Sequence, residues 1–129
     1  MLNDPIADML TRVRNAAQQK HRYVDVRLSK MIIYIIKVLE EEGFVNAHVI
    51  NEDKRLVRIY LKYDKSRSSL INGLKRMSKP GRRVYVKWEE VPIIRRNLGL
   101  SVVSTPKGVM SGTNARKQRM GGELLCTVW

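Results

Sequence analysis

The chain has 129 residues, of which 43% are hydrophobic and 29% charged, a composition typical of a globular protein and not of a disordered tail. Its formal net charge of +13 favours a polyanionic partner, either a nucleic acid or an anionic membrane surface. A single cysteine excludes an intrachain disulfide, no apolar run is long enough to cross a bilayer, and the start of the sequence is unlike a signal peptide, so we expect a cytoplasmic protein.

The first half of the chain predicts a helix, a strand, a second helix and a hairpin. The first helix begins at Pro5, because Asn3 and Asp4 are good cap residues and proline suits the first helical position. Residues 23–27 alternate in polarity and predict a strand.

Residues 31–42 predict the second helix, although the β-branched residues at its start would also suit a strand. The apolar run is longer than a typical strand, it continues into three glutamates, and it stops at Gly43, a natural C-terminal cap. Two strands follow at residues 44–51 and 55–63, joined by a turn over 52–54.

The second half predicts shorter elements after a polar segment, residues 64–69, where we place a domain boundary. In chain order these are a short segment at 70–74, a turn at 79–81, a strand at 82–87, a helical piece from Val91 to Asn97, a strand at 100–104, a basic helix at 113–120 and a final strand at 123–129. The predicted fold class is α+β with two small packed domains. Residues 1–65 form an N-terminal α-β-α-β-β domain, and residues 66–129 form a C-terminal domain that is mostly β with short helices.

Positive charge is concentrated in the second predicted domain. Residues 1–65 hold 12 Lys/Arg and 9 Asp/Glu, a net charge of +3, whereas residues 66–129 hold 13 Lys/Arg and 3 Asp/Glu, a net charge of +10. Near-exclusion of acids from half a protein is unusual for solubility alone, so we expect a nucleic acid to contact mainly residues 66–129.

The candidate binding site of this domain is a turn of small hydroxyl residues, a lysine and a glycine, followed by a basic helix. Ser104, Thr105 and the backbone of Gly108 can hydrogen-bond sugar hydroxyls and base edges, which favours the wide minor groove of RNA. Cationic side chains would contact phosphates, and a polar-tipped aromatic could stack on a base. These roles are assigned to Lys107, Arg116, Lys117, Arg119 and Tyr85.

A glycine pair and a lone carboxylate complete the candidate site. Gly121 and Gly122 let the backbone come close to another group, and Glu123 would accept a hydrogen bond from a base or orient a lysine or arginine. Structural alternatives stay open: the hydroxyl pair as a simple turn, the glycines as a helix exit, and Tyr85 as a packed strand residue. These patterns alone separate RNA from DNA only weakly.

The sequence predicts no enzyme, metal or cofactor. The two histidines, His21 and His48, have no cysteine, histidine or carboxylate at ligand spacing, and no phosphate-binding glycine motif is present. Cys126 lies in an apolar run and is expected to be a buried small hydrophobe. The rival functions are a DNA-binding regulator, for which the basic helix is too short and no dimer seam is visible, and a nucleic-acid enzyme, which lacks an acid/base pair.

Two long segments resemble the motifs of bacterial small-subunit ribosomal protein S8. Residues 4–16 read DPIADMLTRVRNA and resemble the N-terminal motif of that family, whereas residues 98–110 read LGLSVVSTPKGVM and, with Ala115-Arg116 and residues 121–124, resemble its C-terminal signature. The two motifs occur in the right order and at the right spacing, and the resemblance runs from end to end.

The resemblance implies two packed α+β domains and a primary binder of the central domain of small-subunit ribosomal RNA, which helps to assemble the platform. It implies that an irregular RNA helix is read through its minor groove, mostly by the C-terminal domain, beside neighbouring small-subunit proteins and with no membrane or DNA partner. It also suggests translational feedback on the protein's own messenger RNA. By match to the motifs, the main loop contains Ser104, Thr105, Lys107 and Gly108, the RNA core is supported by Tyr85 and Glu123, and auxiliary contacts come from Arg12, Arg14 and Asn15.

One position departs from the family pattern. Pro106 stands where the family usually has a second serine, which removes a hydroxyl and a backbone N–H and fixes φ. On the first helix, Arg12, Arg14 and Asn15 have an equally weighted alternative as solvated residues of an amphipathic helix.

Overall fold

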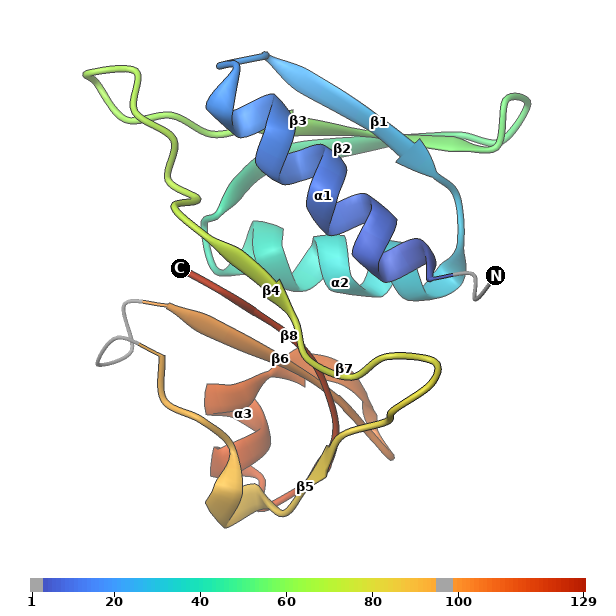
Figure 1. Ribbon diagram of the computed structural model, residues 1–129, viewed down its shortest axis with the longest axis vertical. Helices are drawn as coiled ribbons and strands as arrows, with labels where there is room; N and C mark the ends of the chain where they lie inside the picture. The colour runs from blue at the N-terminus through green and yellow to red at the C-terminus, as the bar shows by residue number, and fades with distance from the viewer. Residues whose placement is uncertain (1–3, 95–98) are drawn as a thin grey trace. The chain divides into compact units, whose positions relative to one another are not determined.

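The computed structural model describes residues 4–94 and 99–129, which fold as two compact units. The first unit is Pro5–Asn72, and the second is Gly73–Trp129 together with Asp4. Each unit combines helix with an antiparallel sheet, which confirms the α+β fold class (Figure 1). The domain limits 1–65 and 66–129 stay a prediction.

The two helices of the first unit begin and end as their sequences predict. Helix α1 (Pro5–Gln18) has Pro5 at its first position and buries one apolar face. Helix α2 (Lys30–Glu41) is capped by Ser29, whose hydroxyl oxygen accepts a hydrogen bond of 3.2 Å from the Ile32 N–H. The chain leaves α2 through Gly43, whose φ of +82° lies in the left-handed region that favours glycine.

The sheet of the first unit has three strands in the order β1-β3-β2, all antiparallel: β1 (Tyr23–Arg27), β2 (Val45–Asn51) and β3 (Leu56–Leu61). Val57 and Ile59 of β3 are fully buried, whereas Arg58 and Tyr60 alternate with them and point to the other face. Helix α1 packs against β1 and α2 against β2, and Figure 1 shows both helices on the same side of the sheet. The sheet therefore has one face covered by helices and one face open.

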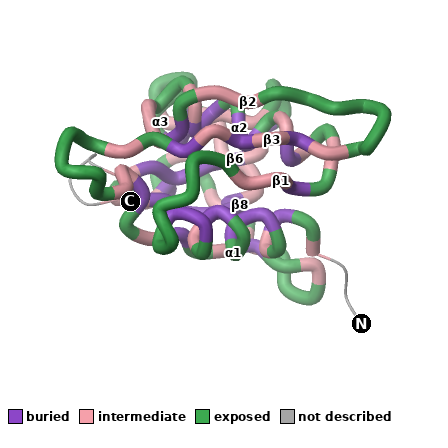
Figure 2. The backbone as a smooth tube through the Cα atoms, turned by 90° about the horizontal axis from the view of Figure 1, so that it is seen from above, coloured by how far each residue is buried: buried purple, intermediate pink, exposed green. Residues whose placement is uncertain are grey.

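The polar segment after β3 is an ordered turn. The Asp64 carboxylate accepts hydrogen bonds of 2.9 Å from the N–H groups of Ser66 and Ser68, and Tyr63 pairs with Ser69. The hydroxyl of Ser66 also donates to this carboxylate, and these bonds hold the pKa of Asp64 below its usual range. The tube in Figure 2 shows the exposed loops of the chain in green.

The second unit is built around its last strand. Strand β8 (Gly122–Val128) pairs along its length with β6 (Leu100–Thr105), at its end with β4 (Leu74–Arg76) and at its start with the short β5 (Tyr85–Val86). Strand β7 (Gly108–Ser111) pairs with the other edge of β6. A bulge between Leu124 and Cys126 interrupts the pairing of β8 with β6.

Helix α3 (Gly112–Lys117) covers one face of this sheet. Ala115 of α3 is fully buried and forms a core cluster with Val91, Val103 and Leu124. The side chain of Ser111 caps the helix by accepting a hydrogen bond of 3.2 Å from the Asn114 N–H. The predicted basic helix is thereby confirmed, although it is shorter than residues 113–120.

Three elements predicted after residue 69 differ from the structure. The strand predicted at 82–87 is reduced to β5, Tyr85–Val86. The short segment predicted at 70–74 is irregular up to Gly73, and the strand instead begins at Leu74, because β8 supplies partners only to residues 74–76. The helical piece predicted from Val91 to Asn97 is wrong for residues 91–94, and the helical turn is the 3₁₀ helix η1 (Trp88–Glu90). Glu90 explains the earlier start, since its carboxylate accepts a hydrogen bond of 2.9 Å from the Lys87 N–H. Residues 95–97 of that prediction lie outside the described residues.

Candidate nucleic-acid interface

The predicted hydroxyl turn connects β6 to β7. Thr105 pairs with Gly108, so that Pro106 and Lys107 form a two-residue loop, and Gly108 has a φ of +118°. The Thr105 hydroxyl donates to the Gly108 carbonyl at 2.8 Å and accepts from the Lys107 N–H at 3.2 Å. Thr105 is buried and holds the shape of the turn, whereas Lys107 at its tip is exposed.

Three predicted residues from three different strands lie in one row. Ser104 of β6 is paired directly with Glu123 of β8, and Glu123 is paired directly with Tyr85 of β5. Directly opposed residues of antiparallel strands point to the same face of a sheet. Ser104, Glu123 and Tyr85 are therefore neighbours, and we call them the Ser104 row.

The Ser104 row lies on the face of the sheet opposite α3. Val103 and Leu124, each one residue from a member of the row, pack with Ala115 of α3, and successive strand residues point to opposite faces. Tyr85 is 71% exposed, which excludes the alternative of a packed strand residue. Its ring is thus available to a partner from solvent.

Glu123 is held by two side chains of the segment before β5. The buried Ser78 hydroxyl donates to the Glu123 carboxylate, and the Arg83 guanidinium donates to the same oxygen at 3.0 Å. The Ser78 oxygen in turn accepts a hydrogen bond of 3.1 Å from the Val84 N–H. Because Arg83 compensates its charge, Glu123 can stay beside a polyanion without repelling it strongly.

Gly121 and Gly122 allow close contact between strands of the protein itself. A Cβ atom on Gly122 would lie 2.0 Å from the Ser104 carbonyl oxygen, and one on Gly121 would lie 2.3 Å from the Val86 carbonyl oxygen. Both neighbours are backbone atoms, which cannot move without separating the strands. The glycines therefore bring β5 and β6 close to β8 and so assemble the Ser104 row.

The basic residues of α3, and Arg119 just after it, lie on the side of the sheet that α3 covers. The Arg116 guanidinium donates to the Val91 carbonyl, Lys117 is exposed, and the Arg119 guanidinium lies 5.7 Å from the ring centre of Trp88. Arg119 lies just after the end of α3, with a φ of +53°. The structure thus divides the predicted phosphate contacts between Lys107, at the turn, and these three cations.

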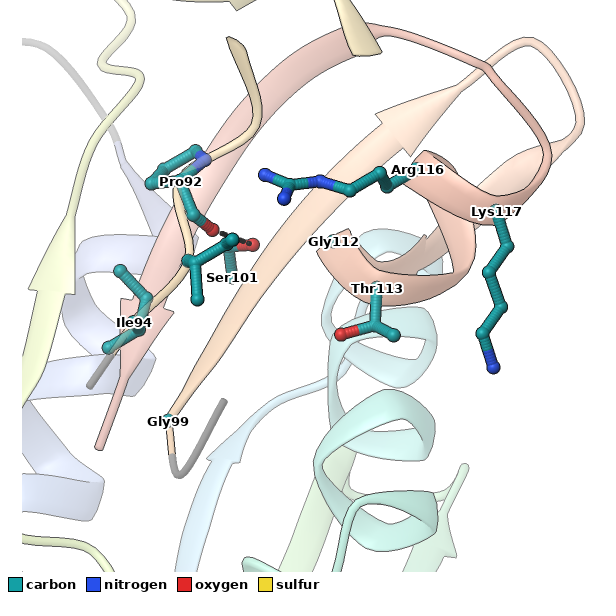
Figure 3. Close-up of a pocket in the computed structure, with 9 residues that line it drawn as sticks. Pro92, Ile94, Gly99, Ser101, Gly112, Thr113, Arg116 and Lys117 are labelled. Atoms are coloured by element: carbon teal, nitrogen blue, oxygen red, sulfur yellow. Dashed lines mark hydrogen bonds between the residues drawn. The ribbon is translucent and has the colours of Figure 1, made fainter. Parts of the chain in front are cut away.

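A pocket of about 250 Å³ lies beside α3 (Figure 3). Its wall includes Arg116, and Figure 3 shows this side chain extending toward Pro92 while Lys117 extends away. The Ser101 hydroxyl donates to the Pro92 carbonyl at 3.3 Å. A Cβ atom added at Gly112 would lie 1.9 Å from the hydroxyl oxygen of Ser101. Ser101 and Gly112 thus fix the approach of α3 to β6.

The predicted auxiliary residues lie on α1 of the first unit and form a separate candidate group. The Arg12 guanidinium pairs with Asp8 one turn earlier at 3.0 Å, and both side chains are about half exposed, 56% and 54%. Arg14 is half-buried and Asn15 is exposed. Arg12 and Asn15 can therefore reach a partner from solvent.

Two residues that position Glu123, Ser78 and Arg83, were not predicted from the sequence. Ser78 lies between a methionine and a lysine before the turn at Pro80-Gly81, and no periodic pattern distinguishes a buried serine there. The basic pair Arg82-Arg83 was a visible signal, because a lone carboxylate in a basic domain requires a cationic partner.

Among residues 4–94 and 99–129, no group of three His, Cys, Asp or Glu side chains is placed to hold a metal ion. In the first unit, the His48 ring nitrogen Nδ1 lies 2.5 Å from a carboxylate oxygen of Glu40. Complete burial raises the pKa of the Cys126 thiol to about 12, which keeps the thiol protonated at neutral pH. Within the described part of the chain, no helix is long and apolar enough to span a membrane.

The chain is similar to known proteins of one family along nearly its whole length. The family model described as ribosomal protein S8 matches residues 4–129. The small ribosomal subunit protein uS8 of Chlamydia pneumoniae is 50% identical, with 100% of this chain and 98% of that protein covered. The proteins of the same name from Roseiflexus castenholzii (50% identical; 99% of this chain and 98% of that one) and Solibacter usitatus (46% identical; 100% of both) are similar over the same extent.

Proposed function

Because the chain belongs to the ribosomal protein S8 family, we propose that it binds the central domain of small-subunit ribosomal RNA as a primary binder and helps to assemble the platform. The family is a structural, non-enzymatic component of the small ribosomal subunit, which confirms the predictions of the family and of a protein that is not an enzyme. Membership also means a protein that acts in translation, bound to the ribosome in the bacterial cytoplasm.

The observation that carries the proposal is the Ser104 row. It places a hydroxyl, a carboxylate and an exposed aromatic ring side by side on the face of the sheet away from α3. Base edges and 2′-hydroxyls in a shallow minor groove need such groups at short range. Since the RNA major groove is too narrow for side chains, the row suits a minor groove opened by an irregular helix.

Phosphate contacts would be supplied around the row. Lys107 stands at the exposed tip of the β6–β7 turn, and Arg83 beside Glu123 keeps 47% of its side chain exposed. These cations provide affinity without sequence information, whereas the row provides selectivity. Pro106 sits at the first position of the turn, where its fixed φ keeps the turn rigid in place of the usual serine contact.

The assembly role follows from rigid binding. A protein surface that matches only one fold of an RNA helix shifts the RNA toward that fold by the difference in affinity. Neighbouring small-subunit proteins would then find their sites formed. The same recognition would extend to the protein's own messenger RNA if that messenger folds into a similar helix, which would give translational feedback.

Filter binding tests the proposal with three ligands: a central-domain rRNA fragment, a scrambled RNA helix, and duplex DNA of matched charge. We expect the fragment to bind at least tenfold more tightly than the DNA at moderate salt, and Ser104→Ala to weaken binding of the fragment alone, by about 1 kcal/mol for one lost hydrogen bond. Lys107→Ala is the matched control, because Lys107 is exposed at the tip of the turn and loss of its charge should weaken all three ligands and reduce the salt slope by about one unit. Equal affinity for RNA and DNA would refute the RNA-specific function.

A further inference from the structure

The open face of the first-unit sheet carries an aromatic pair that lies outside both the Ser104 row and the group on α1. Tyr23 of β1 and Tyr60 of β3 are directly opposed in the register, with ring centres 6.0 Å apart and planes tilted by 59°. Tyr23 is 41% exposed, and both rings lie on the face opposite α1 and α2. Tyr60 is half-buried, but the aromatic pair lies on the sheet face that the two helices of the unit leave open, where a partner can reach it.

An arginine guanidinium lies over each of these rings. The Arg58 guanidinium lies 3.9 Å from the centre of the Tyr23 ring, and Arg22 lies 5.9 Å from that of Tyr60. Asp25 fixes Arg58 in this position through two hydrogen bonds of 2.9 and 3.1 Å. The guanidinium is therefore pre-organised as part of the face before any partner arrives.

A pocket of about 340 Å³ opens next to this surface. Its lining combines apolar side chains with polar and charged ones, the Asp25 carboxylate that pairs with Arg58 among them: Asp25, Val49, Asn51, Lys54, Leu56, Arg58 and Tyr60. Val49 is 55% exposed although it is aliphatic. This volume lies at the lower end of the range of about 300–1,000 Å³ found for small-ligand pockets, which suits one planar group with its substituent.

The charge of the face selects the class of partner. Arg22, Arg27 and Lys62 are exposed around it, whereas the charge of its one acid, Asp25, is compensated by Arg58. The β2–β3 turn, residues 52–55, holds two acids and two bases and adds no net charge. A partner that combines planar apolar groups with regularly spaced negative charge fits both the rings and the cations.

We propose that this face, which we call the Tyr60 face, is a second RNA site that takes unpaired nucleotides. One base stacks on Tyr60 and the Arg58 plane beside the pocket, and the flanking phosphates contact Arg22 and Lys54. Base stacking on aromatic and guanidinium planes of an open sheet is a general mode of single-strand recognition. The site differs from the Ser104 row, which would read a paired helix, and it does not depend on that function.

A fluorescent, unstructured RNA of adenosine and cytidine, about ten nucleotides long, is the probe for the full-length protein. We expect measurable binding at low salt and a loss of about tenfold for Tyr60→Val, which keeps a β-branched strand residue but removes the ring. Tyr60→Phe should bind within twofold of the wild type, because it keeps the ring. Tyr34→Leu on α2, which removes a tyrosine that is 48% exposed outside the face, is the matched control and should have no effect.

A second measurement keeps the test independent of the stability of the variants. Titration of the wild-type protein with the same RNA should shift the NMR methyl signals of Val49, on the Tyr60 face, and leave those of Val103, in the second-unit core, unchanged. Failure of the wild type to bind would overturn the proposal and favour an acidic protein segment as the partner. Equal losses for Tyr60→Phe and Tyr60→Val would also overturn it, since the hydroxyl and not the ring would then be responsible. Neither result bears on binding of the central-domain fragment, which is measured through Ser104→Ala.

Discussion

The Ser104 row and the Tyr60 face are both open faces of antiparallel sheets that expose a tyrosine, but their polar groups are organised differently. In the row, the carboxylate of Glu123 is fixed by hydrogen bonds from Ser78 and Arg83, and Tyr85 at the end of the row is 71% exposed. In the Tyr60 face, the fixed group is the Arg58 guanidinium, which lies over the Tyr23 ring. The row presents hydrogen-bonding groups, and the face presents planar surfaces.

This difference shows how one kind of scaffold supports two kinds of recognition. Hydrogen-bond acceptors at fixed positions discriminate base edges and sugar hydroxyls, while planar surfaces accept any base. In both cases one buried or half-buried side chain orients a charged group: Ser78 orients Glu123, and Asp25 orients Arg58. Substitution of Ser78 or Asp25 therefore tests whether the Ser104 row and the Tyr60 face bind RNA in different ways.

Gly122→Ala should have the largest effect, because it removes the row by separating its strands. The new methyl group would lie 2.0 Å from a backbone oxygen of β6, so we expect a loss of about 3 kcal/mol in the free energy of unfolding, measured by urea denaturation. Gly108→Ala is the control, since its Cβ would meet nothing within 4 Å and only the φ of +118° would be strained. Equal losses for the two variants would show that strand contact at Gly122 is unimportant.

Ser78→Ala should come next, with a loss of about 2 kcal/mol in the free energy of unfolding, since the Val84 N–H and the Glu123 carboxylate each lose a partner. Affinity for the central-domain fragment should fall with it, because Glu123 is no longer oriented. Ser101→Ala removes a different buried hydroxyl, which donates to the Pro92 carbonyl on the α3 face, and should lower stability without this loss of RNA affinity. A fall in RNA affinity for both variants would show a general effect of stability.

Asp25→Asn should have a smaller effect on stability, because the Asp25–Arg58 pair is partly exposed. Its effect on RNA binding should be confined to the Tyr60 face. We expect weaker binding of single-stranded RNA, by less than the tenfold of Tyr60→Val, and unchanged binding of the central-domain fragment. If Asp25→Asn weakens both ligands equally, the two sites are not separate.

The stability difference between wild type and Asp25→Asn should also depend on pH. The hydrogen bond from Arg58 holds the pKa of Asp25 below its ordinary value of 3.8. The stabilisation is therefore complete above pH 3.8 and is lost as the pH falls through the lower pKa of the folded state. Urea denaturation of both proteins should show a difference at pH 6 that shrinks below pH 3.8, and a constant difference would mean that the charge of Asp25 does not contribute.

Arg12→Ala should have the smallest effect. Loss of its exposed pair with Asp8 should lower the free energy of unfolding by only about 0.3 kcal/mol. If Arg12 contacts a phosphate of the central-domain fragment, the salt slope of binding should fall by about one unit or less. An unchanged slope would leave Arg12 as a solvated residue of an amphipathic helix.

Much of the fold could be predicted because local chemistry determines it. Pro5, Ser29 and Gly43 mark the ends of α1 and α2 by their effects on backbone hydrogen bonds and φ, which act within a few residues. The alternation in β3 reports one buried face directly. The helical piece at Val91 was misplaced because Pro92 suits a helix start in general, whereas here the Glu90 carboxylate caps an earlier turn.

The candidate site was only partly readable from sequence, because its members are related by strand pairing over long distances along the chain. Residue types alone identified Ser104, Tyr85 and Glu123, but their order in one row depends on the register of β5 and β6 with β8. The division of the basic residues between the turn and the α3 side likewise depends on which face α3 covers.

The sequence by itself determined the α+β class, the family, the excess of positive charge in the second half and the residues of the β6–β7 turn, since these depend on composition, local periodicity and motifs. Only the tertiary structure decided that Ser78 and Arg83 hold Glu123 and that Tyr23, Arg58 and Tyr60 form one open face. The physical reason is that cross-strand pairing brings together side chains 33 to 45 residues apart, and no local pattern encodes that register.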